Sequence, residues 1–190
     1  MALTLANKIT IARIMAVPLF IGLMLYYKPG HEVYRWTALS VYLLAEISDV
    51  VDGYVARHFR QKTRAGSILD PLADKAIFIS ALLCLYHVGN EAGWDVRLPL
   101  WLVVAFIARD FILVSGALLL QLVCGTFEIA SNIWGKVTAF LQAVCVIAVF
   151  IQWPLALGMW LAALAVTVVS GVIYMMEGIK RLNNGHHDVR

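Results

Sequence analysis

The chain alternates long apolar stretches with short polar connections. Six stretches have the length of about 20 mostly apolar residues that a membrane-spanning helix needs. They cover residues 8–27, 34–57, 67–89, 98–122, 134–153 and 155–181. The pattern predicts an all-α integral membrane protein with six transmembrane helices in one domain, 1–182, followed by a polar tail, 183–190.

Composition supports this interpretation. Of 190 residues, 62% are hydrophobic and 14% charged, with a mean hydropathy of +0.81, whereas soluble proteins average about 45–50% apolar and about 25% charged residues. The first apolar run lacks the small-residue cleavage pattern of a signal peptide, so we expect it to be a retained span. The three cysteines are far apart and lack metal-ligand spacing, which favours a packing role.

Basic residues divide unequally between the two sides of the membrane. One side receives Lys8, Arg13, Arg57, Arg60, Lys62, Arg64, Lys75, Lys136, Lys180, Arg181 and Arg190, and the other receives Lys28, Arg35 and Arg97. Because Lys and Arg concentrate in cytoplasmic segments, both termini are predicted to be cytoplasmic. We expect a multi-pass protein of the inner (cytoplasmic) membrane, with lipids and not nucleic acid as partners.

Four aspartates stand where two of these spans approach the cytoplasm. Asp49 and Asp52 end the second span, and Asp70 and Asp74 begin the third. Residues three or four apart share one face of a helix. Converging carboxylates repel one another unless cations intervene, and oxygen ligands favour Mg²⁺, Mn²⁺ or Ca²⁺ over zinc. The alternative is a set of solvated helix ends.

The residues between the two carboxylate pairs suit a phosphate-bearing substrate. Gly53 and Gly66 would let a ligand approach the backbone. Positive charge comes from Arg57, Arg60, Lys62 and Arg64. For the basic residues outside the aspartate pattern, topology and contact with anionic lipid are the alternative explanation.

The pattern Asp49-x-x-Asp52-Gly53-x-x-Ala56-Arg57, eight residues, then Gly66-x-x-x-Asp70-x-x-x-Asp74 resembles the signature of the CDP-alcohol phosphatidyltransferases. The resemblance implies transfer of a phosphatidyl group from CDP-diacylglycerol to an alcohol, with release of CMP, by a homodimer. It implies that the four aspartates hold two divalent cations, Mg²⁺ or Mn²⁺, and that Asp74 is also the general base. The residues it assigns to CDP binding are Gly53, Ala56, Arg57, Thr63, Gly66 and Ser67.

The entry to the first span also resembles the family, in the pattern Asn7-x-x-Thr10-x-x-Arg13. These residues, with Arg64, are candidates for a substrate or structural role. The alternative for the N-terminal pattern is a helix N-cap followed by a cytoplasmic positive charge.

The acceptor alcohol is suggested by shorter patterns. DPLADK at 70–75 and NKITIAR at 7–13 resemble the bacterial phosphatidylglycerophosphate synthases, whose acceptor is glycerol 3-phosphate. Arg109, within the fourth span, and Lys136, at the start of the fifth, are candidates to bind the acceptor phosphate. The neighbouring Asp110 points about 100° away on a helix and is not expected to pair with Arg109. Structural alternatives are pairing of Arg109 with Glu46 or Glu177 and a flanking role for Lys136.

Two other functions remain open at this point. Ala108-Arg109-Asp110 departs from the Ala-Arg-Glu usual in those synthases and is similar to the cardiolipin synthases, whose acceptor is phosphatidylglycerol. Intramembrane acidic residues can also mark an ion-coupled transporter, but that predicts carboxylates near the midplane. Here they lie toward one face, which favours the enzyme.

Overall fold

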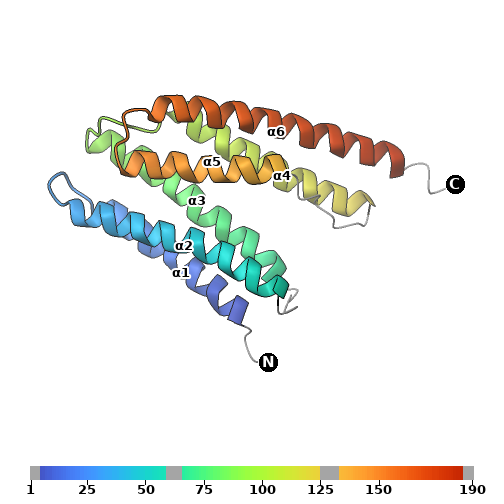
Figure 1. Ribbon diagram of the computed structural model, residues 1–190, viewed down its shortest axis with the longest axis horizontal. Coiled ribbons are helices and arrows are strands. Elements are labelled where there is room, and N and C mark those ends of the chain that lie inside the picture. The colour runs from blue at the N-terminus through green and yellow to red at the C-terminus, as the bar shows by residue number, and fades with distance from the viewer. Residues whose placement is uncertain (1–4, 59–65, 125–132, 186–190) are drawn as a thin grey trace. The chain divides into compact units, whose positions relative to one another are not determined.

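The computed structural model describes residues 5–58, 66–124 and 133–185, with side chains for 9–48, 73, 75–116 and 135–176. These residues form helices and turns only (Figure 1). The helices are α1 (Leu5–Leu25), α2 (Glu32–His58), α3 (Gly66–Glu91), α4 (Leu100–Cys124), α5 (Ile133–Phe150) and α6 (Ala156–Gly185). All six predicted helices are confirmed, and α6 extends past the boundary predicted at residue 182.

The chain forms two compact units, which are described separately. Unit 1 comprises residues 1–98 and 149–152, and unit 2 comprises 99–148 and 153–190. In unit 1, α1 packs along both α2 and α3, and α2 packs against α3. Aromatic rings fill part of this core, because the Phe20 ring contacts those of Tyr42 and Phe150 with centroids 6.3 and 6.2 Å away.

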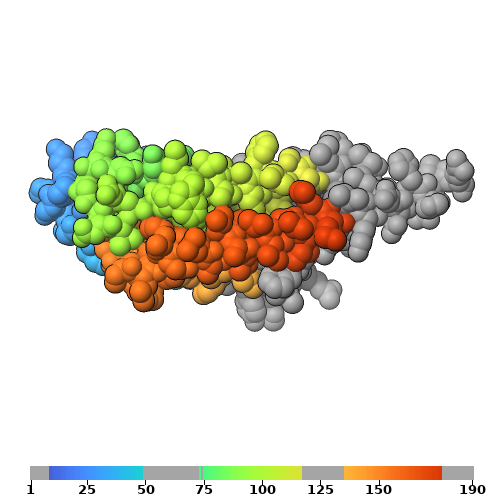
Figure 2. Space-filling model, turned by 90° about the horizontal axis from the view of Figure 1, so that it is seen from above, coloured from blue at the N-terminus to red at the C-terminus, as the bar shows by residue number. Residues whose placement is uncertain are grey.

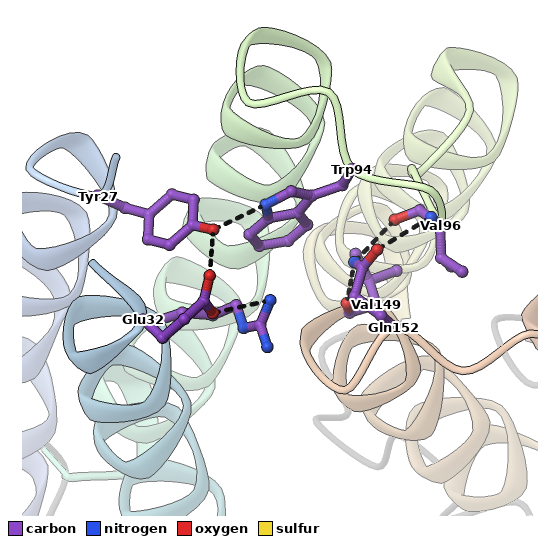
Figure 3. Close-up of polar contacts among 7 residues, drawn as sticks. Tyr27, Glu32, Trp94, Val96, Val149 and Gln152 are labelled. Atoms are coloured by element: carbon purple, nitrogen blue, oxygen red, sulfur yellow. Dashed lines mark hydrogen bonds and ion pairs between the residues drawn. The ribbon is translucent and has the colours of Figure 1, made fainter. Parts of the chain in front are cut away.

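A polar network closes one end of unit 1, where α1 ends and α2 begins (Figure 3). The Trp94 Nε1–H donates to the Tyr27 hydroxyl over 3.2 Å, and that hydroxyl donates to Glu32 over 3.0 Å. The other Glu32 oxygen lies 3.0 Å from Arg35, whose guanidinium also stacks over the Trp94 ring. The network therefore ties the start of α2 to the end of α1 and to the segment after α3.

Two residues with positive φ shape the connections in unit 1. Gly30 has φ +92° in the turn that joins α1 to α2, where the His31 N–H donates to the Lys28 carbonyl. Gln152, after α5, has φ 54°, a conformation that residues other than Gly, Asn and Asp seldom adopt. Its side-chain amide binds both the N–H and the carbonyl of Val96 (Figure 3). Those two hydrogen bonds help to hold Gln152 in this conformation.

In unit 2, α4 packs against α6, and the space-filling view shows the two helices side by side (Figure 2). Large apolar side chains such as Phe111, Leu161 and Val168 are exposed. Polar side chains are buried in the same unit. The buried polar residues are Arg109, Asp110, Thr138, Gln142, Thr167 and Ser170. Unit 2 thus presents apolar side chains outward and encloses polar ones.

One helical stretch in the described part of the chain meets the length and hydropathy expected of a membrane span. It is Ala156–Met176 in α6, 21 residues with a mean hydropathy of 2.1. Two shorter apolar stretches, Ile9–Leu25 in α1 and Gly135–Phe150 in α5, accompany it.

Candidate active site

The four aspartates occupy the helix ends that the sequence predicts. Asp49 and Asp52 lie in the last turns of α2, and Asp70 and Asp74 lie in the first turns of α3. With helical backbone at all four positions, each pair, three or four residues apart, shares one face of its helix. The side chains of all four lie outside the described set, so carboxylate positions remain a prediction.

The helix pairing places the two aspartate pairs at one end of unit 1. Because α2 and α3 pack together and are joined by residues 59–65, the end of α2 lies beside the start of α3 (Figure 1). Asp52 and Asp70 are nearest to this connection, and Asp49 and Asp74 lie about one turn further along each helix. The backbone therefore allows the carboxylate of Asp52 to approach that of Asp70, and the carboxylate of Asp49 to approach that of Asp74 one helical turn further along.

The N-terminal half of α1 brings two buried polar residues to unit 1. Thr10 is 1% and Arg13 2% exposed. Both lie inside α1, which begins at Leu5, so neither Asn7 nor Thr10 is an N-cap of this helix, and the cytoplasmic position of Arg13 stays a prediction. A buried guanidinium needs polar or charged partners, which favours a substrate or structural role. The Asn7 side chain lies outside the described set.

The residues expected to bind CDP fall at the same helix ends. Gly53, Ala56 and Arg57 have helical backbone in the last turns of α2, while Gly66 and Ser67 open α3. Their side-chain arrangement is not part of the described structure. Thr63 and Arg64, in the connection, lie outside the described residues altogether.

Arg109 has a partner that the sequence interpretation rejected. Its NH1 donates to the Asp110 carboxylate over 2.9 Å, and its NH2 donates to the Ser170 hydroxyl of α6 over 3.1 Å. The expectation that Asp110 points too far away was therefore wrong, because the long Arg109 side chain folds back across the angle between the two residues. A phosphate is not required as counter-ion, and the role of Arg109 in acceptor binding stays a prediction.

Lys136 is exposed near the start of α5, so a phosphate could reach it from outside. The neighbouring Gly135 lies against α6, where a Cβ would meet the Tyr174 hydroxyl oxygen at 2.8 Å. Glycine at this position therefore lets the Tyr174 side chain lie against the first turn of α5.

Sequence reasoning did not single out four buried polar residues of unit 2, which are Thr138, Gln142, Thr167 and Ser170. The available signal was their spacing, because polar residues that recur at three and four positions in an apolar helix mark an inward face.

Metal binding rests on residues whose side chains are not described. Among the side chains that are described, no three His, Cys, Asp or Glu residues gather in a metal-binding group. The predicted donor set of four carboxylates on two adjacent helix ends consists of hard oxygen ligands, which suit Mg²⁺ or Mn²⁺.

Comparison with known proteins gives one family along most of the chain. The model of the CDP-alcohol phosphatidyltransferase family matches residues 3–171. A Bacillus subtilis (strain 168) relative named CDP-diacylglycerol--glycerol-3-phosphate 3-phosphatidyltransferase is 33% identical, over 96% of this chain and 98% of the relative.

Two further relatives point to related activities. A Mycobacterium tuberculosis (strain ATCC 25618 / H37Rv) protein named "Probable phosphatidylglycerophosphate synthase" is 32% identical over 93% of this chain and 82% of its own length. A Streptomyces coelicolor protein named cardiolipin synthase (CMP-forming) is 37% identical, but over 58% of this chain and 48% of its own length.

Proposed function

Because this chain belongs to the CDP-alcohol phosphatidyltransferase family, we propose that it transfers a phosphatidyl group from CDP-diacylglycerol to glycerol 3-phosphate. The products are phosphatidylglycerophosphate and CMP. The observation that carries the proposal is the complete aspartate signature on two adjacent helix ends, in a chain similar along nearly its whole length to a relative named for this reaction.

The four aspartates are the proposed ligands of two divalent cations. Asp49 and Asp52 from α2 and Asp70 and Asp74 from α3 supply the carboxylates. When bound, Mg²⁺ or Mn²⁺ would neutralise the pyrophosphate of CDP-diacylglycerol and stabilise charge on its oxygens. Gly53 and Gly66 leave room for the nucleotide against the backbone.

Asp74 has the proposed second role of general base. The attacking hydroxyl of the acceptor is a weak nucleophile until it loses its proton, and a nearby carboxylate can accept that proton. The new bond joins the acceptor oxygen to the phosphorus of the phosphatidyl group, and the bond from that phosphorus to the oxygen of CMP breaks. Arg57, with Ala56, Thr63 and Ser67, is proposed to hold the CDP moiety.

The surface of the molecule supports a location in the membrane. Exposed apolar side chains such as Met15, Leu44 and Phe111 would be costly in water but suit lipid tails, while Arg13 and Arg109 are buried. We therefore propose six membrane spans with both termini and the aspartates at the cytoplasmic face, as the distribution of basic residues predicts. CDP-diacylglycerol could then keep its acyl chains in the bilayer.

Glycerol 3-phosphate is the favoured acceptor because the relatives aligned over 93% and 96% of this chain have names that refer to that acceptor or its product. Arg109 and Lys136 are proposed to bind its phosphate. Phosphatidylglycerol is the second candidate, since Arg109 is followed by Asp110, as in the cardiolipin synthases that the sequence resembles.

A CMP-release assay on the purified protein tests both the chemistry and the acceptor. With CDP-diacylglycerol and Mg²⁺ or Mn²⁺ present, we expect release with glycerol 3-phosphate and none with phosphatidylglycerol. EDTA should abolish release, and excess Mg²⁺ should restore it. Release with phosphatidylglycerol alone would identify cardiolipin synthesis, and metal-independent release would contradict the proposed role of the aspartates.

A further inference from the structure

The buried polar side chains of unit 2 are costly unless they find hydrogen-bond partners. Several are satisfied within the protein. Arg109 donates to Asp110 and to Ser170, and the Thr167 hydroxyl donates to the Ala163 carbonyl over 2.6 Å. These residues are accounted for by the packing of α4 and α6.

Three buried donors of unit 2 are not satisfied in this way. The Nε of Arg109, the Nε2 of Gln142 and the Nε1 of Trp160 are inaccessible to solvent and have no acceptor among the described residues. Gln142 is 1% exposed, and the Arg109 side chain 9%. Since nearly all buried donors in folded proteins are paired, the unpaired donors of Arg109 and Gln142 point to a ligand with hydrogen-bond acceptor oxygens.

The contacts of α5 show which way Gln142 faces. Near its start, Gly135 lies against Tyr174 of α6, and further along, the Cys145 thiol lies 3.9 Å from the Met159 carbonyl of the same helix. Positions 135, 142 and 145 fall within about 80° of one another around a helix. Gln142 therefore faces α6, the helix whose Ser170 holds the guanidinium of Arg109.

The charges of this group also restrict the ligand. Asp110 already balances the charge of Arg109 at 2.9 Å, so Arg109 attracts an anion less strongly. Ligand binding then depends more on hydrogen bonds from the remaining N–H groups. The Gln142 amide is a neutral donor with two N–H groups. Such a site favours a ligand whose oxygens can accept hydrogen bonds from these N–H groups. The phosphate monoester of a small polyol has several such oxygens.

We propose that Gln142 is a specificity-determining residue that donates from its amide to the acceptor substrate, alongside the Nε of Arg109. The inference rests on the proposed function and names a group that donates hydrogen bonds to the oxygens of glycerol 3-phosphate. Phosphatidylglycerol carries similar glycerol and phosphate oxygens, so the test includes both compounds.

The Gln142→Met variant tests this role, with Thr167→Val as the matched control. Methionine has nearly the same shape but no donor, so the ligand-free variant should be at least as heat-stable as the wild type, because an unpaired buried donor is removed. The KM for glycerol 3-phosphate should rise about tenfold or more, as expected for a lost hydrogen bond to a charged group. The KM for CDP-diacylglycerol should not change.

Thr167→Val removes a buried hydroxyl that is already bonded to the backbone, so it should leave both KM values unchanged. Glycerol 3-phosphate alone should raise the melting temperature of the wild type and of Thr167→Val, but not that of Gln142→Met. If the methionine variant does not fold, Gln142→Glu keeps the shape and replaces the donor by a carboxylate, and it should weaken glycerol 3-phosphate binding further.

The outcomes distinguish failure of the role proposed for Gln142 from failure of the proposed function. An unchanged KM for glycerol 3-phosphate in Gln142→Met, with an active wild type, overturns the role of Gln142 and leaves the proposed function standing. Equal losses in Gln142→Met and Thr167→Val would show that the effect is structural and overturn it too. A wild type that turns over phosphatidylglycerol alone overturns the proposed acceptor and this inference together.

Discussion

Asp110 supplies the negative charge that balances Arg109 inside unit 2, and its replacement tests that pairing. The Arg109 and Asp110 side chains are 9% and 5% exposed, with 2.9 Å between NH1 and Oδ1. At an effective dielectric constant of about 20, two unit charges at this distance attract by about 6 kcal/mol. The cost of removing both charges from water offsets much of this attraction.

The Asp110→Leu variant keeps a side chain of similar volume and leaves the guanidinium buried without its counter-charge. Loss of one partner of a buried pair costs about 3–5 kcal/mol. For a protein of this size, that corresponds to a fall in melting temperature of roughly 6–20 °C. The double variant Arg109→Met/Asp110→Leu removes both charges and should recover most of the loss, since apolar replacement of a whole pair is often neutral or stabilising.

Thermal unfolding of the detergent-solubilised protein, followed through its six tryptophans, measures these differences. The wild type, both single variants and the double variant form a cycle that isolates the coupling between the two residues. An Asp110→Leu variant as stable as the wild type would refute the reasoning. So would a double variant no more stable than the less stable single variant.

Three further predictions concern the connections and the chemistry. Tyr27→Phe removes the hydroxyl that links Trp94 to Glu32 and should cost about 1–3 kcal/mol; an unchanged melting temperature in detergent would argue against this network. Gly30→Ala forces a Cβ onto a residue with φ +92° and should destabilise by about 1–2 kcal/mol in the same melting experiment, whereas equal stability would show that the turn adapts. Asp74→Asn should bind CDP-diacylglycerol, measured by equilibrium binding, but release CMP at less than about 1% of the wild-type rate, because loss of a general base typically costs about 10²–10⁴-fold; near-normal CMP release would contradict the assignment of Asp74 as the base.

The helices could be predicted well because their hydrophobic runs are long and their ends carry strong signals. The Lys28-Pro29-Gly30 turn separates α1 from α2, and Trp153-Pro154 separates α5 from α6. The aspartate spacing likewise predicts shared helix faces, since helical backbone alone places Asp49 with Asp52 and Asp70 with Asp74.

Pairing between polar side chains could not be predicted to the same degree. Arg109 has a side chain long enough to reach back to Asp110 and across to Ser170, and backbone angles alone do not reveal this reach. The Trp94–Tyr27 hydrogen bond joins residues 67 positions apart. Such contacts depend on which helices pack together. The hydropathy pattern does not show which residues of different segments come into contact.

Transfer of labelled glycerol 3-phosphate into lipid tests the central claim most directly. Purified protein would be incubated with CDP-diacylglycerol, Mg²⁺ and glycerol 3-phosphate carrying ¹⁴C in the glycerol, and the chloroform-soluble product would be counted and identified. We expect label in phosphatidylglycerophosphate, dependent on CDP-diacylglycerol and absent with Asp70→Asn. Unlabelled lipid after complete incubation, or equal labelling by the Asp70→Asn variant, would contradict the proposed reaction at the aspartate site.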